Sequence, residues 1–319
     1  MVARLEQDTF PAMGTACAAA VTAPAGESRR ARTALAAARA EVEACERALS
    51  RFDPGSDLSR LNAAGGAWTP VGERLLAALQ AALRARLDSG GRFDPTVLPA
   101  LVAAGYDRTF AELEQREPRP ARSWRAGAAI ELDRERGAAR LEPGAAVDLG
   151  GIGKGFGAAR ALDAMREAWP GLPGALVDLG GDIAVEGAPP GDGPWRIAVA
   201  EPRRPGATLG TIALRAGGVA TSGRDRRRFG PGRALHHLID PATGLPAARG
   251  PLAVTVVAPD APQAEAFATA LAVCSLDEGR ALLARLPALA ALRVPDEGEP
   301  ETVNGFPWLR QPSPSAAAA

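Results

Sequence analysis

Two kinds of apolar pattern alternate along the chain, and they predict different secondary structures. Apolar residues that recur three and four positions apart are typical of helices with one buried face. One such helix is predicted to begin at Ser28, whose hydroxyl would cap it, and another ends at the glycine stop Ser89-Gly90-Gly91. With two helices that begin at capping boxes, the predicted helices cover approximately residues 28–49, 71–88, 158–169, 260 onward and 275–286.

Shorter apolar runs bounded by turn residues predict strands between these helices. The two runs that flank Arg136-Gly137 predict a hairpin, and a third run leads directly into a glycine-rich turn at residue 148. Residues 220–224 and 236–246 form a polar region between the predicted strands. The predicted strands cover approximately residues 15–21, 129–133, 138–142, 145–149, 175–183, 195–200, 208–214 and 253–257.

Composition limits the class of protein. The 319 residues are predicted to form, over residues 1–310, one large domain or two intimately associated lobes, followed by a disordered tail at 311–319. The net charge of zero argues against nucleic acid as a partner. Three widely spaced cysteines predict buried free thiols. The first seven residues hold no apolar stretch, so the sequence as written predicts a cytoplasmic protein without an export signal or membrane segment.

Residues 148–157 contain the strongest chemical signal. Five glycines surround Lys154 and follow Asp148, just before a predicted helix. Glycine allows a backbone to approach a ligand closely, and amides at a helix start suit an anion, so this stretch predicts a phosphate-bearing ligand. Neither a P-loop nor a dinucleotide fingerprint fits its spacing. The alternative interpretation is a glycine-rich turn with a solvated lysine.

Three other places carry candidate chemistry, each with a structural alternative. The polar loop 50–62 is either a surface loop or a binding loop whose Phe52 stacks on a flat ligand. His237 lies near Asp240 and is either a proton acceptor or a loop residue with a structural hydrogen bond. Glu265 and Thr269 are four residues apart on one helix face, which suits a hard cation but is also common on solvated faces.

Eight segments in sequence order give the chain a family resemblance. It resembles the FAD:protein FMN transferases, also called ApbE-type flavin transferases. The resemblance implies an α+β fold with mixed or antiparallel sheets, flanking helices and an FAD cleft between lobes. The segments that carry it are residues 12–15, 50–62, 91–96, 148–156, 177–183, 220–223, 237–246 and 265–271.

The resemblance also implies a reaction and a set of site residues. In the family, Mg²⁺-dependent enzymes transfer FMN from FAD to a Ser or Thr hydroxyl of an acceptor flavoprotein and release AMP, often outside the cytoplasmic membrane. His237 matches the catalytic base. The flavin-binding positions are matched by Met13, Phe52, Arg92, Phe93, Asp94, Asp148, Lys154 and Ile239. The magnesium positions are matched by Gly151 through its carbonyl, Glu265, Ala268 and Thr269.

Some positions depart from the family pattern. Glu265 stands where aspartate is usual, which lengthens the carboxylate arm by about 1.5 Å. Phe156 replaces a common tyrosine, and Ala104, Ala159 and Arg224 replace a tryptophan and two acids. Two alternatives to the transferase stay open: an FAD pyrophosphatase, in which water replaces the acceptor hydroxyl and FMN and AMP are formed, and an FAD-binding protein whose catalysis is impaired by Glu265 and its neighbours.

Overall fold

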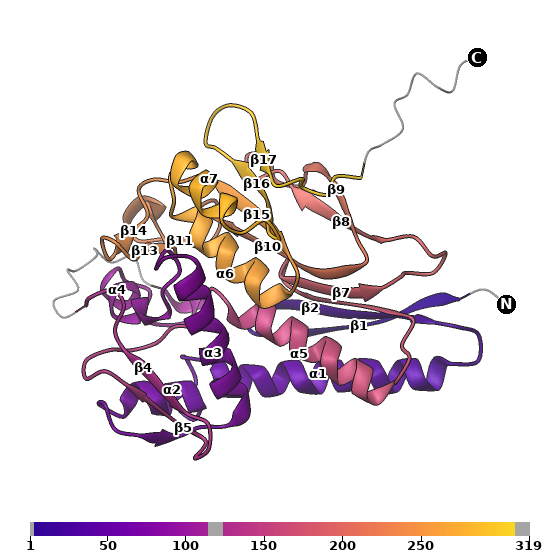
Figure 1. Cartoon of the computed structure of the whole chain (residues 1–319), viewed down its shortest axis with the longest axis horizontal. Coiled ribbons are helices and arrows are strands. Elements are labelled where there is room, and N and C mark those ends of the chain that lie inside the picture. The colour runs from indigo at the N-terminus through magenta and orange to yellow at the C-terminus, as the bar shows by residue number, and fades with distance from the viewer. Residues whose placement is uncertain (1–2, 114–123, 310–319) are drawn as a thin grey trace.

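The computed structural model describes residues 3–113 and 124–309 and is built around one antiparallel sheet (Figure 1). Every neighbouring pair in this eight-stranded sheet is antiparallel. With the helices described below, the sheet confirms the predicted α+β class. The strands in spatial order are β1 (Arg4–Ala12), β2 (Thr15–Ala23), β6 (Gly174–Leu179), β7 (Ile183–Gly187), β10 (Ala216–Gly223), β15 (Ala253–Ala258), β16 (Ala290–Val294) and β17 (Glu301–Val303).

Alternating apolar residues make both faces of this sheet hydrophobic, so both are covered. One face packs on α1 (Ser28–Leu49), α5 (Gly153–Ala168) and α6 (Ala261–Ala272), and Figure 1 shows α1 and α5 running side by side. Val177 faces these helices. The other face packs on a hairpin of β8 (Trp195–Ala200) and β9 (Thr208–Leu214). The helical face is the one that carries the candidate site.

A smaller lobe lies against α6. A single hydrophobic core joins Leu75 and Leu79 of this lobe to Phe267 and Leu271 of α6. The lobe contains α2 (Asp57–Ala63), α3 (Glu73–Asp88), α4 (Leu98–Ala103) and a sheet of β3 (Thr69–Pro70), β5 (Ala138–Leu141) and β4 (Ile130–Asp133). The remaining elements are α7 (Leu276–Ala284), the 3₁₀ turns η1 (Pro95–Val97), η2 (Phe110–Glu112) and η3 (Pro231–Arg233), and the short strands β11 (Arg228–Phe229), β12 (Leu235–His236), β13 (Ile239–Asp240) and β14 (Leu245–Pro246).

Several local predictions are confirmed. The strands at 195–200 and 208–214 have the predicted bounds, and the hairpin around Arg136-Gly137 is present. Ser275 and Glu278 form a complete capping box at the start of α7. All three cysteines are free and buried. Within the described ranges no helix is long and apolar enough to cross a membrane. The predicted tail at 311–319 lies outside the described residues.

The strand predicted at 15–21 is present as β2, and a further strand, β1, precedes it; Met13 and Gly14 take positive φ angles of 50° and 69° and turn the chain between the two. Three local predictions are wrong, for identifiable reasons. Residues 145–149 form no strand, since Asn62 takes both backbone groups of Val147. Residues 220–223, which were placed in a polar region between strands, belong to β10. Ser28 does not cap α1, because its hydroxyl accepts a hydrogen bond from Arg4.

Candidate functional site

Helix α5 begins earlier than the pattern of the glycine-rich stretch predicts. The helix starts at Gly153, so Lys154 lies in its first turn and projects from a fixed backbone. Two glycines are required for packing here. A Cβ on Gly155 would lie 2.3 Å from the carbonyl oxygen of Ala261, and one on Gly151 would lie 3.0 Å from Oγ1 of Thr269. The glycines therefore bring the start of α5 into direct contact with α6.

Lys154 lies between two buried carboxylates that come from distant parts of the sequence. Its Nζ is 2.6 Å from Oε1 of Glu265 in α6 and also contacts Oδ2 of Asp182, which follows the turn after β6. Oε2 of Glu265 accepts a hydrogen bond from the Gly155 amide at 2.7 Å. The side chains of Asp182 and Glu265 are only 6% and 3% exposed, so this is an interior ionic cluster.

Burial and pairing act in opposite directions on the pKa values of this cluster. Burial by itself lowers the pKa of Lys154, but the charges of Asp182 and Glu265 outweigh it and hold that pKa above its ordinary value. Burial raises the pKa of Glu265 to about 7, against the opposing effect of Lys154. Lys154 is therefore fully charged at neutral pH, and its charge is balanced locally.

The predicted cation ligands come together beside this cluster. Thr269 lies one turn after Glu265 on α6, its Oγ1 is 3.2 Å from Oγ of Ser222, and the backbone of Gly151 packs against it. Ala268 is buried in the same turn. The set offers oxygen donors only, which fits a hard cation such as Mg²⁺. No group of three or more His, Cys, Asp or Glu side chains able to hold a metal occurs within 3–113 and 124–309; the predicted set has a single carboxylate.

Arg51 connects two of the predicted flavin-binding residues. Its Nε lies 2.7 Å from Oδ2 of Asp148, and its guanidinium lies 4.1 Å from the ring centre of Phe52. The same guanidinium lies 4.7 Å from the ring centre of Tyr106. Phe52 itself is 41% exposed, so this stack presents an accessible aromatic ring next to a carboxylate. Both are suitable contacts for a flat heterocycle.

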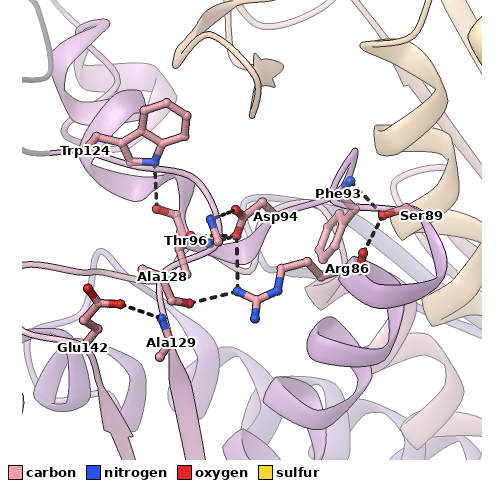
Figure 2. A network of polar contacts seen from close by, with 10 residues as sticks. Arg86, Ser89, Phe93, Asp94, Thr96, Trp124, Ala128, Ala129 and Glu142 are labelled. Atoms are coloured by element: carbon pink, nitrogen blue, oxygen red, sulfur yellow. Dashed lines mark hydrogen bonds and ion pairs between the residues drawn. The ribbon is translucent and has the colours of Figure 1, made fainter.

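Asp94 and Arg92 have other partners. The carboxylate of Asp94 is buried and accepts hydrogen bonds from Thr96 and from the Gly127 amide, with Arg86 at 3.9 Å, as Figure 2 shows for Thr96 and Arg86. Arg92 pairs with Glu278 of α7 at 2.6 Å. Asp94 therefore shapes the turn that places its neighbour Phe93, whose ring packs against Gly151.

The two histidines differ in environment. His236 is buried: its Nε2 lies 3.0 Å from the Ala247 carbonyl and its Nδ1 accepts from the Leu238 amide, so its role is structural. Nδ1 of His237 is buried and has no hydrogen-bond partner among the described residues. Burial lowers the pKa of His237 to about 3, with the charges of Arg227 and Lys154 acting in the same direction. His237 is therefore a neutral imidazole at pH 7.

Asp240 lies near His237 in sequence but makes no hydrogen bond to it among the described residues. Its Oδ1 accepts a hydrogen bond from the Ala242 amide at 2.9 Å and so stabilises the following turn. A cavity of about 430 Å³ adjoins this region, and His236 is one of the residues that line it. None of the predicted site residues lines this cavity.

The last two predicted residues flank the site. Met13 reaches the start of α5, where its Cε lies 4.0 Å from the position of a Cβ on Gly153, and its amide donates to Glu46 at 2.7 Å. Ile239 is buried in one cluster with Tyr106 and thus supports the aromatic stack.

The structure thus brings most of the predicted residues to the junction of α5 and α6, and it adds residues that the sequence interpretation missed. Asp182 and Arg51 were not named as site residues, although each lies within a segment that carries the family resemblance: Asp182 follows the Gly180-Gly181 turn in 177–183, and Arg51 precedes Phe52 in 50–62. An acid directly after a buried strand and a glycine pair was the signal that could have identified Asp182.

Comparisons with known proteins agree with this arrangement. The family model described as ApbE family matches residues 13–293. The FAD:protein FMN transferase of Klebsiella pneumoniae is 28% identical over 289 residues, which are 86% of this chain and 80% of that protein. The structure of the ApbE protein from Thermotoga maritima has a TM-score of 0.81 at 28% identity and covers 93% of this chain and 96% of that one. The apo flavinyl transferase ApbE of Pseudomonas stutzeri has a TM-score of 0.78 at 27% identity and covers 95% of each chain.

Proposed function

The chain belongs to the ApbE family, and from that premise we propose that it transfers FMN from FAD to a Ser or Thr hydroxyl of an acceptor protein and releases AMP. The names of its relatives support flavin transfer. The observation that carries the proposal is the meeting of Lys154, Glu265 and Thr269 with the backbone of Gly151 at one point. Such a site combines a cation for phosphate with hard oxygen ligands for Mg²⁺.

FAD would bind across the junction of the lobes. Phe52 offers an exposed ring for stacking, and Asp148 lies within reach of the same surface through its pairing with Arg51. Phe93, Met13 and Ile239 would provide apolar contacts, while Asp94 and Arg92 would act by holding the turn that carries Phe93. The pyrophosphate would lie at the start of α5, where Lys154 neutralises negative charge.

Mg²⁺, held by Glu265, Thr269 and the carbonyls of Gly151 and Ala268, would supply charge neutralisation on the phosphoryl oxygens. The imidazole of His237, whose Nδ1 has no hydrogen-bond partner among the described residues, would accept the proton of the acceptor hydroxyl. The hydroxyl oxygen forms a bond to the phosphorus of the FMN half. The bond from that phosphorus to the bridging oxygen breaks, and its electron pair leaves with AMP.

The test measures binding and products separately. Calorimetry with FAD is expected to show binding, and incubation with FAD, Mg²⁺ and host-cell proteins is expected to give a fluorescent band that survives denaturing electrophoresis, with AMP released. The His237→Gln variant is expected to bind FAD but to give no band. Absence of FAD binding would contradict the proposal, and rapid release of free FMN with AMP and no fluorescent band would assign the site to FAD hydrolysis instead.

A further inference from the structure

Lys154 is the only lysine in the sequence, and the other 36 of the 37 Lys and Arg residues are arginines. It is held between Asp182 and Glu265, both nearly inaccessible to solvent. An ammonium is a compact point charge with three donors, so it fits between two carboxylates where a guanidinium would need a planar opening. The single lysine therefore forms a buried ionic link between α5 and Glu265 of α6.

Both oxygens of Glu265 are already engaged in this arrangement. Oε1 lies 2.6 Å from Nζ of Lys154, and Oε2 accepts from the Gly155 amide at 2.7 Å. A divalent cation bound at Oε1 would lie within a few ångströms of the ammonium, and like charges at that distance repel strongly in a buried site. Any cation that uses Glu265 as a ligand therefore competes with Lys154 for the same oxygen.

We propose that the contact with Lys154 keeps Glu265 from ligating the cation. The pyrophosphate of FAD must then draw Lys154 away before Glu265 can ligate the cation. The inference rests on the proposed function, since the pyrophosphate is the anion that moves the lysine. Asp182 keeps a carboxylate beside Lys154 when the contact with Glu265 is lost. Binding is then ordered, FAD before the cation, and the protein holds its divalent cation weakly until FAD is present.

The contact between Glu265 and Lys154 depends on the length of the Glu265 side chain. This side chain spans from α6 to both the ammonium of Lys154 and the amide of Gly155 on α5. An aspartate at this position is shorter by about 1.5 Å and cannot keep contacts of 2.6 and 2.7 Å at the same time. Glu265→Asp thus breaks the contact with Lys154 without changing the charge of residue 265. Lys154→Met breaks the same contact by removing the ammonium group.

The decisive experiment measures Mn²⁺ binding without FAD, by loss of the free-ion spin-resonance signal. Glu265→Asp and Lys154→Met are each expected to bind Mn²⁺ about tenfold more tightly than the unmodified protein, because a charge-assisted hydrogen bond no longer competes. The double variant is expected to bind no more tightly than Lys154→Met alone, since both changes release one contact. Glu186→Asp, in an exposed pair with Arg166 at the far end of α5, is the matched control and should bind as the unmodified protein does.

Two results would overturn the proposal that Lys154 competes with the cation for Glu265. If Glu265→Asp tightens Mn²⁺ binding equally with and without Lys154, aspartate is merely a better ligand. If neither single variant tightens binding, there is no competition to release.

A second readout follows the lysine itself. Because the sequence has one lysine, protein labelled with carbon-13 at the lysine Cε gives one lysine resonance. FAD added without divalent cation is expected to shift this resonance, and in Glu265→Asp it should already be displaced before FAD is added. A resonance that stays in place while calorimetry shows bound FAD would contradict the inference. Failure to bind FAD at all would contradict the proposed function, while the Mn²⁺ measurements would still decide whether Lys154 competes.

Discussion

At the residue scale, Arg51 explains how an exposed aromatic ring is held in a defined orientation. Its guanidinium lies over both Phe52 and Tyr106 and pairs with Asp148, while its own side chain is only 7% exposed. One face of Phe52 is thereby supported by a planar cation, and the ring remains accessible. The sequence indicated Phe52 and Asp148 but not Arg51, because one arginine in an arginine-rich chain has no distinguishing pattern.

Replacing Phe52 by leucine is expected to weaken FAD binding about two- to tenfold, since aromatic stacking contributes roughly 0.5–1.5 kcal/mol beyond burial of the same area. The melting temperature should stay nearly constant, because the ring is 41% exposed. The control is Trp68→Leu, which removes an equally exposed ring that also lies under an arginine, Arg140. Calorimetric titration with FAD checks both, and equal weakening by the two changes would remove Phe52 from the site.

At the element scale, the start of α5 shows what a pattern can and cannot predict. The glycines at its first turn have low helix propensity, so the sequence places the helix start at residue 158 rather than at Gly153. Packing against α6 stabilises that first turn instead. Segments with strong periodicity or caps, such as α3 and α7, were predicted within two residues. Residues 145–149 were not, because a side chain in α2 replaces the sheet partner that the apolar run implies.

Gly155→Ala is expected to destabilise the protein by about 1–3 kcal/mol, because the new methyl group would lie 2.3 Å from the backbone oxygen of Ala261 and must push α5 and α6 apart. Gly157→Ala, one half-turn later in the same helix, is the matched control. Its methyl group would meet only the side chains of Leu179 and Met13, at 3.2 Å or more. Urea denaturation of both variants tests this, and equal stability of the two would mean that the helices can separate without strain.

At the scale of the whole molecule, the family resemblance seen in the sequence is confirmed, but the contacts that assemble the site are not visible in sequence. Lys154 and Glu265 are 111 residues apart, and only folding shows that they share a hydrogen bond. Asp182 joins them from a third segment. Motif matching therefore indicates which segments matter, whereas the partners of each side chain depend on how α5, α6 and the turn after β6 pack.

Glu41 is a second point where distant elements meet. It lies in α1, is 9% exposed, and contacts Arg74 of α3 through two hydrogen bonds at 2.9 and 2.5 Å. Arg160 of α5 donates to the same carboxylate at 3.2 Å. Burial raises the pKa of Glu41, but the two arginines outweigh burial and hold that pKa below its usual value. This carboxylate therefore connects α3 of the smaller lobe to α1 and α5, two of the three helices that cover one face of the main sheet.

Glu41→Gln is expected to cost about 2 kcal/mol at pH 7, because Arg74 loses its paired carboxylate and Arg160 keeps only the exposed Glu73, while both arginines are partly exposed to solvent. Since the folded-state pKa of Glu41 is depressed, its contribution is present above the unfolded value near 4.5 and is lost as the pH falls through the folded value. The difference between the variant and the unmodified protein should thus shrink at pH 3.5. Glu131→Gln, in an exposed pair with Arg140, is the control and should change stability by less than about 1 kcal/mol. Urea denaturation at both pH values measures the effect, and a loss at pH 7 no larger than that of the control would show that the lobes are held together by their shared apolar core alone.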